Sequence, residues 1–212
     1  MSSSGPLPLI VSSPSGAGKT TLTRRLMQAV DGLVFSVSHT TRQPRSSEVN
    51  GREYHFVSPD EFRSLVERDE FLEWATVHQS LYGTARSELV RAGAARGIIF
   101  DIDHQGARQI KCAVPDAVAV FILPPSMEIL EARLRGRASE DEATVRARFQ
   151  VARSEIAHYG LFDYVLVNDD LATATEQLVA IFRAEECRRR RAARTAERLL
   201  AEGRRRDLTN VP

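Results

Sequence analysis

Between residues 12 and 21 the chain reads Ser12-Ser13-Pro14-Ser15-Gly16-Ala17-Gly18-Lys19-Thr20-Thr21. An apolar run, Leu7 to Val11, precedes this segment, and apolar residues at helical spacing follow it. The pattern predicts a buried strand, a glycine-rich loop and an amphipathic helix. Such a loop is suited to an anion, because its freed backbone N–H groups and the start of the next helix present positive charge. The first glycine of the usual pattern G-x-x-x-x-G-K-[ST] is Ser13 here.

The side chains of this loop have distinct expected roles. Lys19 would reach the outer phosphates of a nucleotide, and the hydroxyl of Thr20 would hold a magnesium ion. Phosphate binding is favoured over a turn that binds nothing, because the motif and its strand–helix context agree. The predicted nucleotide-binding residues of the loop are Ser15, Gly16, Ala17, Gly18, Lys19, Thr20 and Thr21.

Composition bounds the class of protein. With 212 residues, of which 42% are hydrophobic, the chain can hold one α/β domain with insertions. No apolar run approaches the roughly 20 residues of a membrane span, and Met1 to Pro6 lacks the features of a signal peptide. Cys112 and Cys187 lie far apart, which suits a reducing compartment and indicates neither a disulfide framework nor a metal site. We therefore expect a cytoplasmic protein with no membrane association.

The net charge of +1 conceals an asymmetry. From Arg188 onward there are nine arginines against three acidic residues, so this tail carries about +6 and the rest of the chain about −5. Because no aromatic residues are interleaved, a solvated extension of the last helix, frayed toward Asn210, is favoured over a nucleic-acid-binding surface.

The order of the predicted elements indicates a parallel-sheet core with two other regions inserted. Residues 1–34 are assigned to the core, 35–92 to a β-rich insertion, 93–125 to the core again, 126–158 to a helical lid region, 159–184 to the last part of the core, and 185–212 to a basic extension. A short alternating strand from Phe35 would open the insertion, in place of a second parallel core strand. Ser58 and Pro59 predict a helix start within the insertion.

The apolar strand that starts at Ile98 ends in two carboxylates, Asp101 and Asp103. A carboxylate beside a phosphate loop can hold magnesium through water. Strand-terminal aspartates also cap the helices that follow them. Only the pairing with Lys19 favours the first interpretation.

The region from Arg133 to Arg153 is rich in arginine. A solvated helical hairpin with exposed ion pairs and a mobile lid over a phosphoryl group are equally compatible with the spacing. The arginines concerned are Arg133, Arg135, Arg137, Arg146, Arg148 and Arg153.

Five separated motifs match one family in order and spacing: Ser36-Val37-Ser38-His39-Thr40-Thr41-Arg42-x-Pro44-Arg45-x-x-Glu48-x-x-Gly51-x-x-Tyr54-x-Phe56-Val57, Phe71-Leu72-Glu73-Trp74, Leu81-Tyr82-Gly83-Thr84, Asp101-Ile102-Asp103-x-Gln105-Gly106 and Val167-Asn168-Asp169-Asp170. From about Leu7 to about Ala184 the chain resembles the guanylate kinases, which transfer the terminal phosphate of ATP to GMP. The resemblance implies a phosphate-loop kinase fold, with the insertion binding GMP.

The resemblance also implies a GMP site. Residues that match Arg42, Arg45, Tyr54 and Tyr82 hold the GMP phosphate in this family, and guanidinium and phenol groups are suitable donors to a dianion. Ser38, Glu73 and Thr84 match the residues that read the base. An ionised Glu73 can accept hydrogen bonds from N1–H and the exocyclic amine of guanine, whereas the N1 acceptor of adenine would repel it. Glu48, Asp101 and Asp103 complete the implied GMP-binding set, with no division of roles between the two aspartates.

For phosphoryl transfer, the resemblance implies a catalytic set of Lys19, Arg45, Arg137 and Arg148. Arg133 would lie near the ATP phosphates, and Asn168, with Asp169 beside it, would contact the adenine. Magnesium, the implied cofactor, would be held by Thr20 and, through water, by Asp101. Arg135, Arg146 and Arg153 carry no such implication and are expected to be solvated.

ATP and GMP are the implied partners, and the sequence reveals neither tolerance of dGMP nor the oligomeric state. Two other functions fit the sequence less well. A scaffold module with this fold has no need of Lys19, Thr20 or the lid arginines. A sugar-phosphate kinase has no use for a guanine-reading set at Ser38, Glu73 and Thr84.

Overall fold

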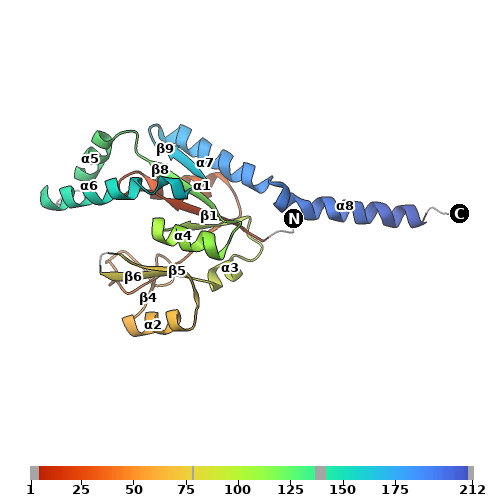
Figure 1. The fold of residues 1–212 in the computed structure, drawn as a ribbon, viewed down its shortest axis with the longest axis horizontal. Helices are drawn as coiled ribbons and strands as arrows, with labels where there is room; N and C mark the ends of the chain where they lie inside the picture. The colour runs from red at the N-terminus through yellow and green to blue at the C-terminus, as the bar shows by residue number, and fades with distance from the viewer. Residues whose placement is uncertain (1–4, 78, 137–141, 210–212) are drawn as a thin grey trace.

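The computed structural model describes residues 5–77, 79–136 and 142–209. Its core is a five-stranded parallel sheet in the order β2-β7-β1-β8-β9 (Figure 1). The strands are β1 (Leu7–Ser12), β2 (Leu33–Phe35), β7 (Gly97–Asp101), β8 (Val118–Leu123) and β9 (Tyr164–Val167). The three central strands are almost continuously apolar, because helices cover both faces of the sheet.

Two helices on each face close the core. On one face, α1 (Lys19–Ala29) and α7 (Leu171–Glu186) bury Leu22, Leu26 and Leu178 among others. On the other, α3 (Ser87–Ala92) and α4 (His104–Ala113) pack against Ile98 and Phe100. The expected α/β fold with a parallel-sheet core is confirmed.

The edge strand β2 corrects one expectation. Leu33–Phe35 pairs in parallel with β7, in the register Leu33↔Gly97 to Phe35↔Ile99. A second parallel core strand therefore does precede the insertion. It ends at Phe35, the residue at which the sequence predicted that the first strand of the insertion begins. With only three residues, all half-buried, β2 is too short to show a hydrophobic period in the sequence.

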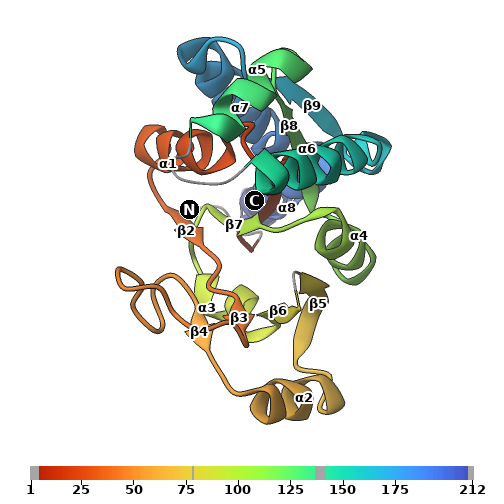
Figure 2. The same ribbon diagram turned by 90° about the vertical axis from the view of Figure 1, so that its left-hand side faces the viewer.

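The insertion is a separate four-stranded sheet in the order β4-β3-β6-β5 (Figure 2). It comprises β3 (His39–Thr40), β4 (His55–Phe56), β5 (Phe71–Val77) and β6 (Ser80–Ala85), with α2 (Pro59–Glu67) packed on it through Phe62. The predicted helix start is confirmed, because Ser58 and Glu61 form a reciprocal capping box before α2.

The lid region consists of two packed helices, α5 (Met127–Arg135) and α6 (Glu142–Ile156), followed by the short 3₁₀ helix η1 (Tyr159–Leu161). Leu130, Leu134, Val145 and Ala152 form a small core between α5 and α6. On the solvent side, Arg135 pairs with Glu131 and Glu142. This region is therefore a helical hairpin with its own apolar seam and exposed ion pairs.

The tail forms α8 (Arg189–Thr209), which points away from the domain at the end opposite the lid (Figure 1). Its base is fastened by Arg190 to Asp116 at 2.8 Å and by Arg191 to the Gly5 carbonyl at 3.2 Å. Among the described helices, none has both the length and the apolar character that a membrane crossing requires.

Candidate active site

The glycine-rich loop is built between β1 and α1 as the motif predicts. Gly16 and Gly18 have φ values of 94° and 99°, in the region that disfavours any side chain. A Cβ on Gly18 would lie 2.2 Å from Asn168 Nδ2, so glycine is needed for space as well. Among described non-glycine residues only Asp69 and Gln79 have positive φ, so the backbone at Ser13 does not require glycine.

Asn168, which directly follows β9, supports the backbone of this loop. It is buried, and its Nδ2 donates to the Ala17 carbonyl at 2.8 Å. Its own carbonyl accepts a hydrogen bond from Arg133 Nη2 at 3.2 Å. The other nitrogen, Arg133 Nη1, is buried and has no hydrogen-bond partner among the described residues. An unsatisfied buried guanidinium nitrogen is costly, and an anionic ligand would satisfy it.

The two carboxylates after β7 have different partners. Asp101 forms an ion pair with Lys19. Asp103 Oδ1 accepts from the Gly106 backbone N–H at 2.9 Å and caps α4. The capping interpretation is thus realised at Asp103, whereas Asp101 makes the expected pairing with Lys19.

Three cavities surround these residues. The loop cavity, about 270 Å³, is lined by Ser13, Pro14, Ser15, Gly16, Gly18, Lys19, Thr20, Asp103 and Glu155. The hairpin cavity, about 390 Å³, is lined by Gly16, Gly18, Thr21, Arg133, Gly136, Asn168, Asp169 and Leu171. The insertion cavity, about 260 Å³, is lined by Lys19, Ser38, Tyr54, Glu73, Ala75, Val77, Tyr82, Asp101, Ile102 and Asp103. Lys19 and Asp103 line both the loop cavity and the insertion cavity, so these two cavities adjoin at Lys19.

At one end of the insertion cavity lies a buried chain of polar groups. Thr84 Oγ1 donates to Glu73 Oε1 at 2.6 Å, and Ser38 Oγ lies 3.0 Å from Thr84 Oγ1. Glu73 is only 5% exposed. Burial raises the pKa of the Glu73 carboxyl to about 7, the nearby Asp103 adds to the rise, and the Thr84 hydrogen bond opposes it. The carboxyl oxygen not bonded to Thr84 remains able to accept from a ligand.

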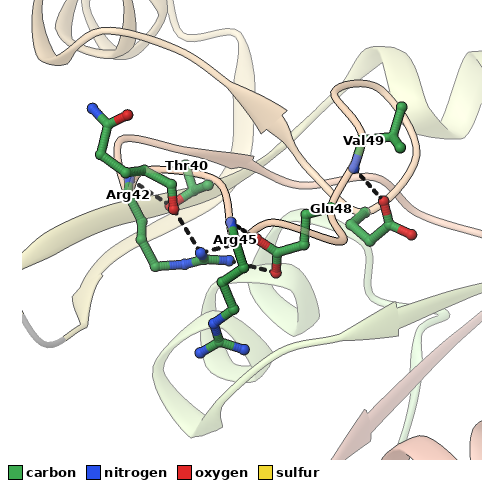
Figure 3. Close-up of polar contacts among 7 residues, drawn as sticks. Thr40, Arg42, Arg45, Glu48 and Val49 are labelled. Atoms are coloured by element: carbon green, nitrogen blue, oxygen red, sulfur yellow. Dashed lines mark hydrogen bonds and ion pairs between the residues drawn. The ribbon is translucent and has the colours of Figure 1, made fainter.

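Beside Tyr54 and Tyr82, which line the insertion cavity, lies a turn that carries Arg42, Arg45 and Glu48 (Figure 3). Arg42 donates from both terminal nitrogens to the two oxygens of Glu48, at 3.0 and 2.9 Å. The same carboxylate accepts from the Arg45 backbone N–H at 2.7 Å and so holds both arginines on one turn. Arg42 lies 5.5 Å over the Tyr54 ring, and Tyr54 and Tyr82 meet edge to face at 5.9 Å.

The other two charged residues of this turn, Arg45 and Glu48, are placed differently from Arg42 with respect to an anionic ligand. The Arg45 side chain is exposed and points away from the Glu48 carboxylate (Figure 3). Glu48 itself is occupied with Arg42, and a carboxylate would repel a phosphate. Any action of Glu48 on an anionic ligand therefore passes through Arg42.

The lid reaches the glycine-rich loop through α6. Arg148 Nη2 donates to Ser15 Oγ at 2.9 Å. Glu155 Oε2 accepts from the Ser15 backbone N–H at 3.3 Å and lines the loop cavity. Arg137 lies outside the described residues.

Comparison with known proteins decides the family. The guanylate kinase family model matches residues 6–185. The chain belongs to the guanylate kinase family. Among similar proteins, the guanylate kinase of Neisseria meningitidis serogroup A is 51% identical over 184 residues, which cover 86% of this chain and 88% of the relative. The guanylate kinase of Aromatoleum aromaticum is 50% identical over 181 residues, covering 85% and 89%.

A solved guanylate kinase has the same fold. The crystal structure of the Anaplasma phagocytophilum enzyme is 33% identical, has a TM-score of 0.73, and is matched over 90% of this chain and 92% of that chain. The family expected from the separated motifs is thereby confirmed.

The guanylate kinase site also contains residues that the sequence analysis did not assign. Glu155 contacts the loop backbone from 140 positions away. Gly106 lies against Glu73, since a Cβ there would be 2.7 Å from Glu73 Oε2. A glycine near the start of a helix is the only local signal of this contact, because glycine is a poor helix former. Gln109, discussed below, had no local signal.

Proposed function

We propose that the chain transfers the γ-phosphate of ATP to GMP, giving ADP and GDP, across the junction of the loop cavity and the insertion cavity. The observation that carries this proposal is the position of Lys19, which lines both cavities. A donor phosphate in one cavity and an acceptor phosphate in the other would meet at this ammonium group. In-line transfer requires that juxtaposition and no covalent intermediate with the enzyme.

ATP binds with its phosphates on the glycine-rich loop. Backbone N–H groups of the loop and of the start of α1 face the phosphates, while the Ala17 N–H keeps its bond to the Pro14 carbonyl. Arg133, with its unsatisfied buried nitrogen, donates to a phosphate oxygen. The adenine and ribose occupy the hairpin cavity, where Asn168 and Asp169 form one wall.

GMP binds in the insertion cavity, with its base toward Glu73. The ionised carboxylate accepts from N1–H and the exocyclic amine, while Ser38 and Thr84 fix the orientation of Glu73. At the opposite end, Arg42, Arg45, Tyr54 and Tyr82 bind the phosphate. Glu48 orients Arg42 through its bidentate contact. Discrimination against AMP arises because adenine leaves the buried carboxylate unpaired.

The residues at Lys19 fit a magnesium ion that is held mainly by substrate. The described residues contain no group of three or more histidine, cysteine or acidic side chains placed to chelate a metal. Magnesium instead keeps several waters and binds through one or two protein groups plus phosphates. The Thr20 hydroxyl, and Asp101 through water, supply such groups. When bound, the ion neutralises charge that develops on the phosphates.

Arginines and exclusion of water complete the transfer. Arg45, Arg137 and Arg148 stabilise charge on the moving phosphoryl group. Closing of the lid region (126–158) and the insertion (35–92) over the core excludes water, which would compete with GMP as the acceptor. Because the Arg45 side chain is exposed, it is available to approach the phosphates on closing.

A coupled assay of ADP production tests the proposal. With ATP present, GMP should be the preferred acceptor over AMP and over a sugar phosphate, and dGMP is included in the same panel. Lys19→Ala should abolish transfer but leave GMP binding, measured by calorimetry, largely intact. Equal turnover of AMP or a sugar phosphate, or near-normal turnover of Lys19→Ala, would contradict the proposed function.

A further inference from the structure

The side chain of Gln109 makes two hydrogen bonds to the backbone of one residue of the insertion, Trp74. Its Oε1 accepts from the Trp74 backbone N–H at 3.1 Å, and its Nε2 donates to the Trp74 carbonyl at 2.9 Å. Trp74 lies on β5, the edge strand of the insertion sheet, and directly follows Glu73. The carboxamide thus takes the place that a neighbouring strand would have at this edge.

Gly106, one turn before Gln109 on α4, makes the closest approach to Glu73 itself. The two residues are three positions apart on the helix and therefore share a face. A Cβ at Gly106 would lie 2.7 Å from Glu73 Oε2 and 3.2 Å from Glu73 Cδ. Glycine at this position leaves the Glu73 carboxyl room in its present orientation.

The helix that carries both residues begins at the junction of the cavities. Asp103, the N-cap of α4, lines both the loop cavity and the insertion cavity. In Figure 1, α4 lies between the core sheet and the insertion, and it packs on β5. Opposite α4, the pairing of β5 with β6 shifts register between Phe71 and Glu73, an irregularity of the kind that re-aims a side chain. The orientation of Glu73 therefore depends on the irregular pairing of β5 and on the contacts of α4 with this strand.

We propose that Gly106 and Gln109 form a clamp that positions Glu73 for reading guanine and thereby sets the acceptor specificity. Both are positioning residues, because they act through Glu73 and its peptide and touch no reacting atom. This inference rests on the proposed function, since it concerns the GMP end of the same site. The clamp places the base-reading carboxyl relative to the core helix, so GMP is positioned against the core as well as within the insertion.

The first test is Gln109→Met, which keeps the length of the side chain and its tendency to form helix but removes both hydrogen bonds. We expect KM for GMP to rise about 10-fold or more, because freeing the peptide next to Glu73 loosens the buried carboxyl. KM for ATP should stay unchanged, and the preference for GMP over AMP should fall. The matched control is Arg108→Met, on the exposed face of the same helix, which should leave all three values unchanged.

The second test is Gly106→Ala. In a helix this change ordinarily stabilises by about 1 kcal/mol, so a loss of GMP use without a fall in Tm separates displacement of Glu73 from unfolding. We expect KM for GMP to rise and KM for ATP to stay constant, as for Gln109→Met.

The outcomes distinguish the clamp from a purely structural contact. A lower Tm with unchanged KM for GMP and unchanged preference over AMP, in both variants, would overturn the clamp. Equal loss of ATP and GMP affinity would overturn it too. If the unaltered chain fails to prefer GMP, the proposed function itself fails, and the variants are not needed to show it.

Discussion

At the scale of single residues, Glu73 combines a cost in stability with a gain in selectivity. Its carboxyl is buried among Ser38, Thr84 and Asp103, without a cation among the causes of its pKa shift. A charged form held there without a ligand is unfavourable. In the proposed complex the N1–H and amine donors of guanine supply the hydrogen bonds that the protein does not, and a base that lacks these donors would leave the carboxylate unpaired.

The pH dependence of activity follows from the pKa of Glu73 near 7. Below this pH the carboxyl is protonated, and its O–H would face the N1–H donor of guanine. We expect kcat/KM for GMP to fall as the pH is lowered from 8 to 6, because this parameter reports groups of the free enzyme. The GMP phosphate titrates in the same way in assays of the unaltered chain and of Glu73→Gln, but only the unaltered chain has the carboxyl. The difference between their pH profiles of kcat/KM therefore isolates the titration of Glu73. Parallel profiles would remove Glu73 from base recognition.

The stability of the ligand-free chain should respond in the opposite direction. Because burial raises the pKa of Glu73 from 4.5 to about 7, its stabilising contribution is complete below about pH 4.5 and is lost as the pH rises through about 7. Glu73→Gln should therefore stabilise the chain at pH 8, by up to about 3 kcal/mol, and much less at pH 5. Urea unfolding at the two pH values measures this. An equal effect at both would contradict the burial argument.

At the scale of elements, the glycine-rich loop depends on β9 as much as on α1. Asn168 holds the Ala17 carbonyl and fills the space beside Gly18. The loop is therefore shaped by a strand about 150 residues away in sequence.

Gly18→Ala should disrupt the loop for two reasons. The new Cβ would lie 2.2 Å from Asn168 Nδ2, and alanine disfavours a φ of 99°. We expect a loss of roughly 1–3 kcal/mol in stability and at least a 10-fold weaker binding of a non-hydrolysable ATP analogue, by calorimetry. Gly203→Ala on α8, where nothing lies within 4 Å, is the control and should bind the analogue normally. Normal binding by both variants would show that the loop tolerates a side chain at Gly18.

At the scale of the whole molecule, the guanylate kinase family model matches one part of the chain, residues 6–185. The helix α8 extends beyond this part, at the end of the molecule opposite α5 and α6 (Figure 1), and the described residues that line the three cavities include none from α8. Its connection to the core is at its base, through Arg190 and Arg191. We therefore expect activity to be separable from the tail.

A chain that ends after Arg191 should keep both basal contacts and the same kcat and KM values for ATP and GMP. Steady-state kinetics on the full and shortened chains measures this. The same pair of proteins, compared for salt-dependent retention on a nucleic-acid column, tests whether the arginine-rich tail is only solvated, as we expect. A large loss of turnover in the shortened chain would assign the tail a role in the site.

The amino-acid sequence by itself determined the phosphate-loop motif and the family, and through the family resemblance it predicts the base-reading set at Ser38, Glu73 and Thr84. These follow from motifs in which neighbouring residues carry the chemistry, so spacing along the chain is sufficient to recognise them. It also determined the capped start of α2 at Ser58, because a capping box is local.

Only the tertiary structure decided the rest. The short strand β2 takes its place from pairing with β7, since three residues have no readable period. Asp101 and Asp103 are distinguished by their partners, because Asp101 pairs with Lys19 and Asp103 caps the start of α4. The contacts of Glu155 with Ser15 and of Gln109 with Trp74 join residues 140 and 35 positions apart. Such contacts are made by folding, because close packing brings together groups whose separation in sequence carries no signal.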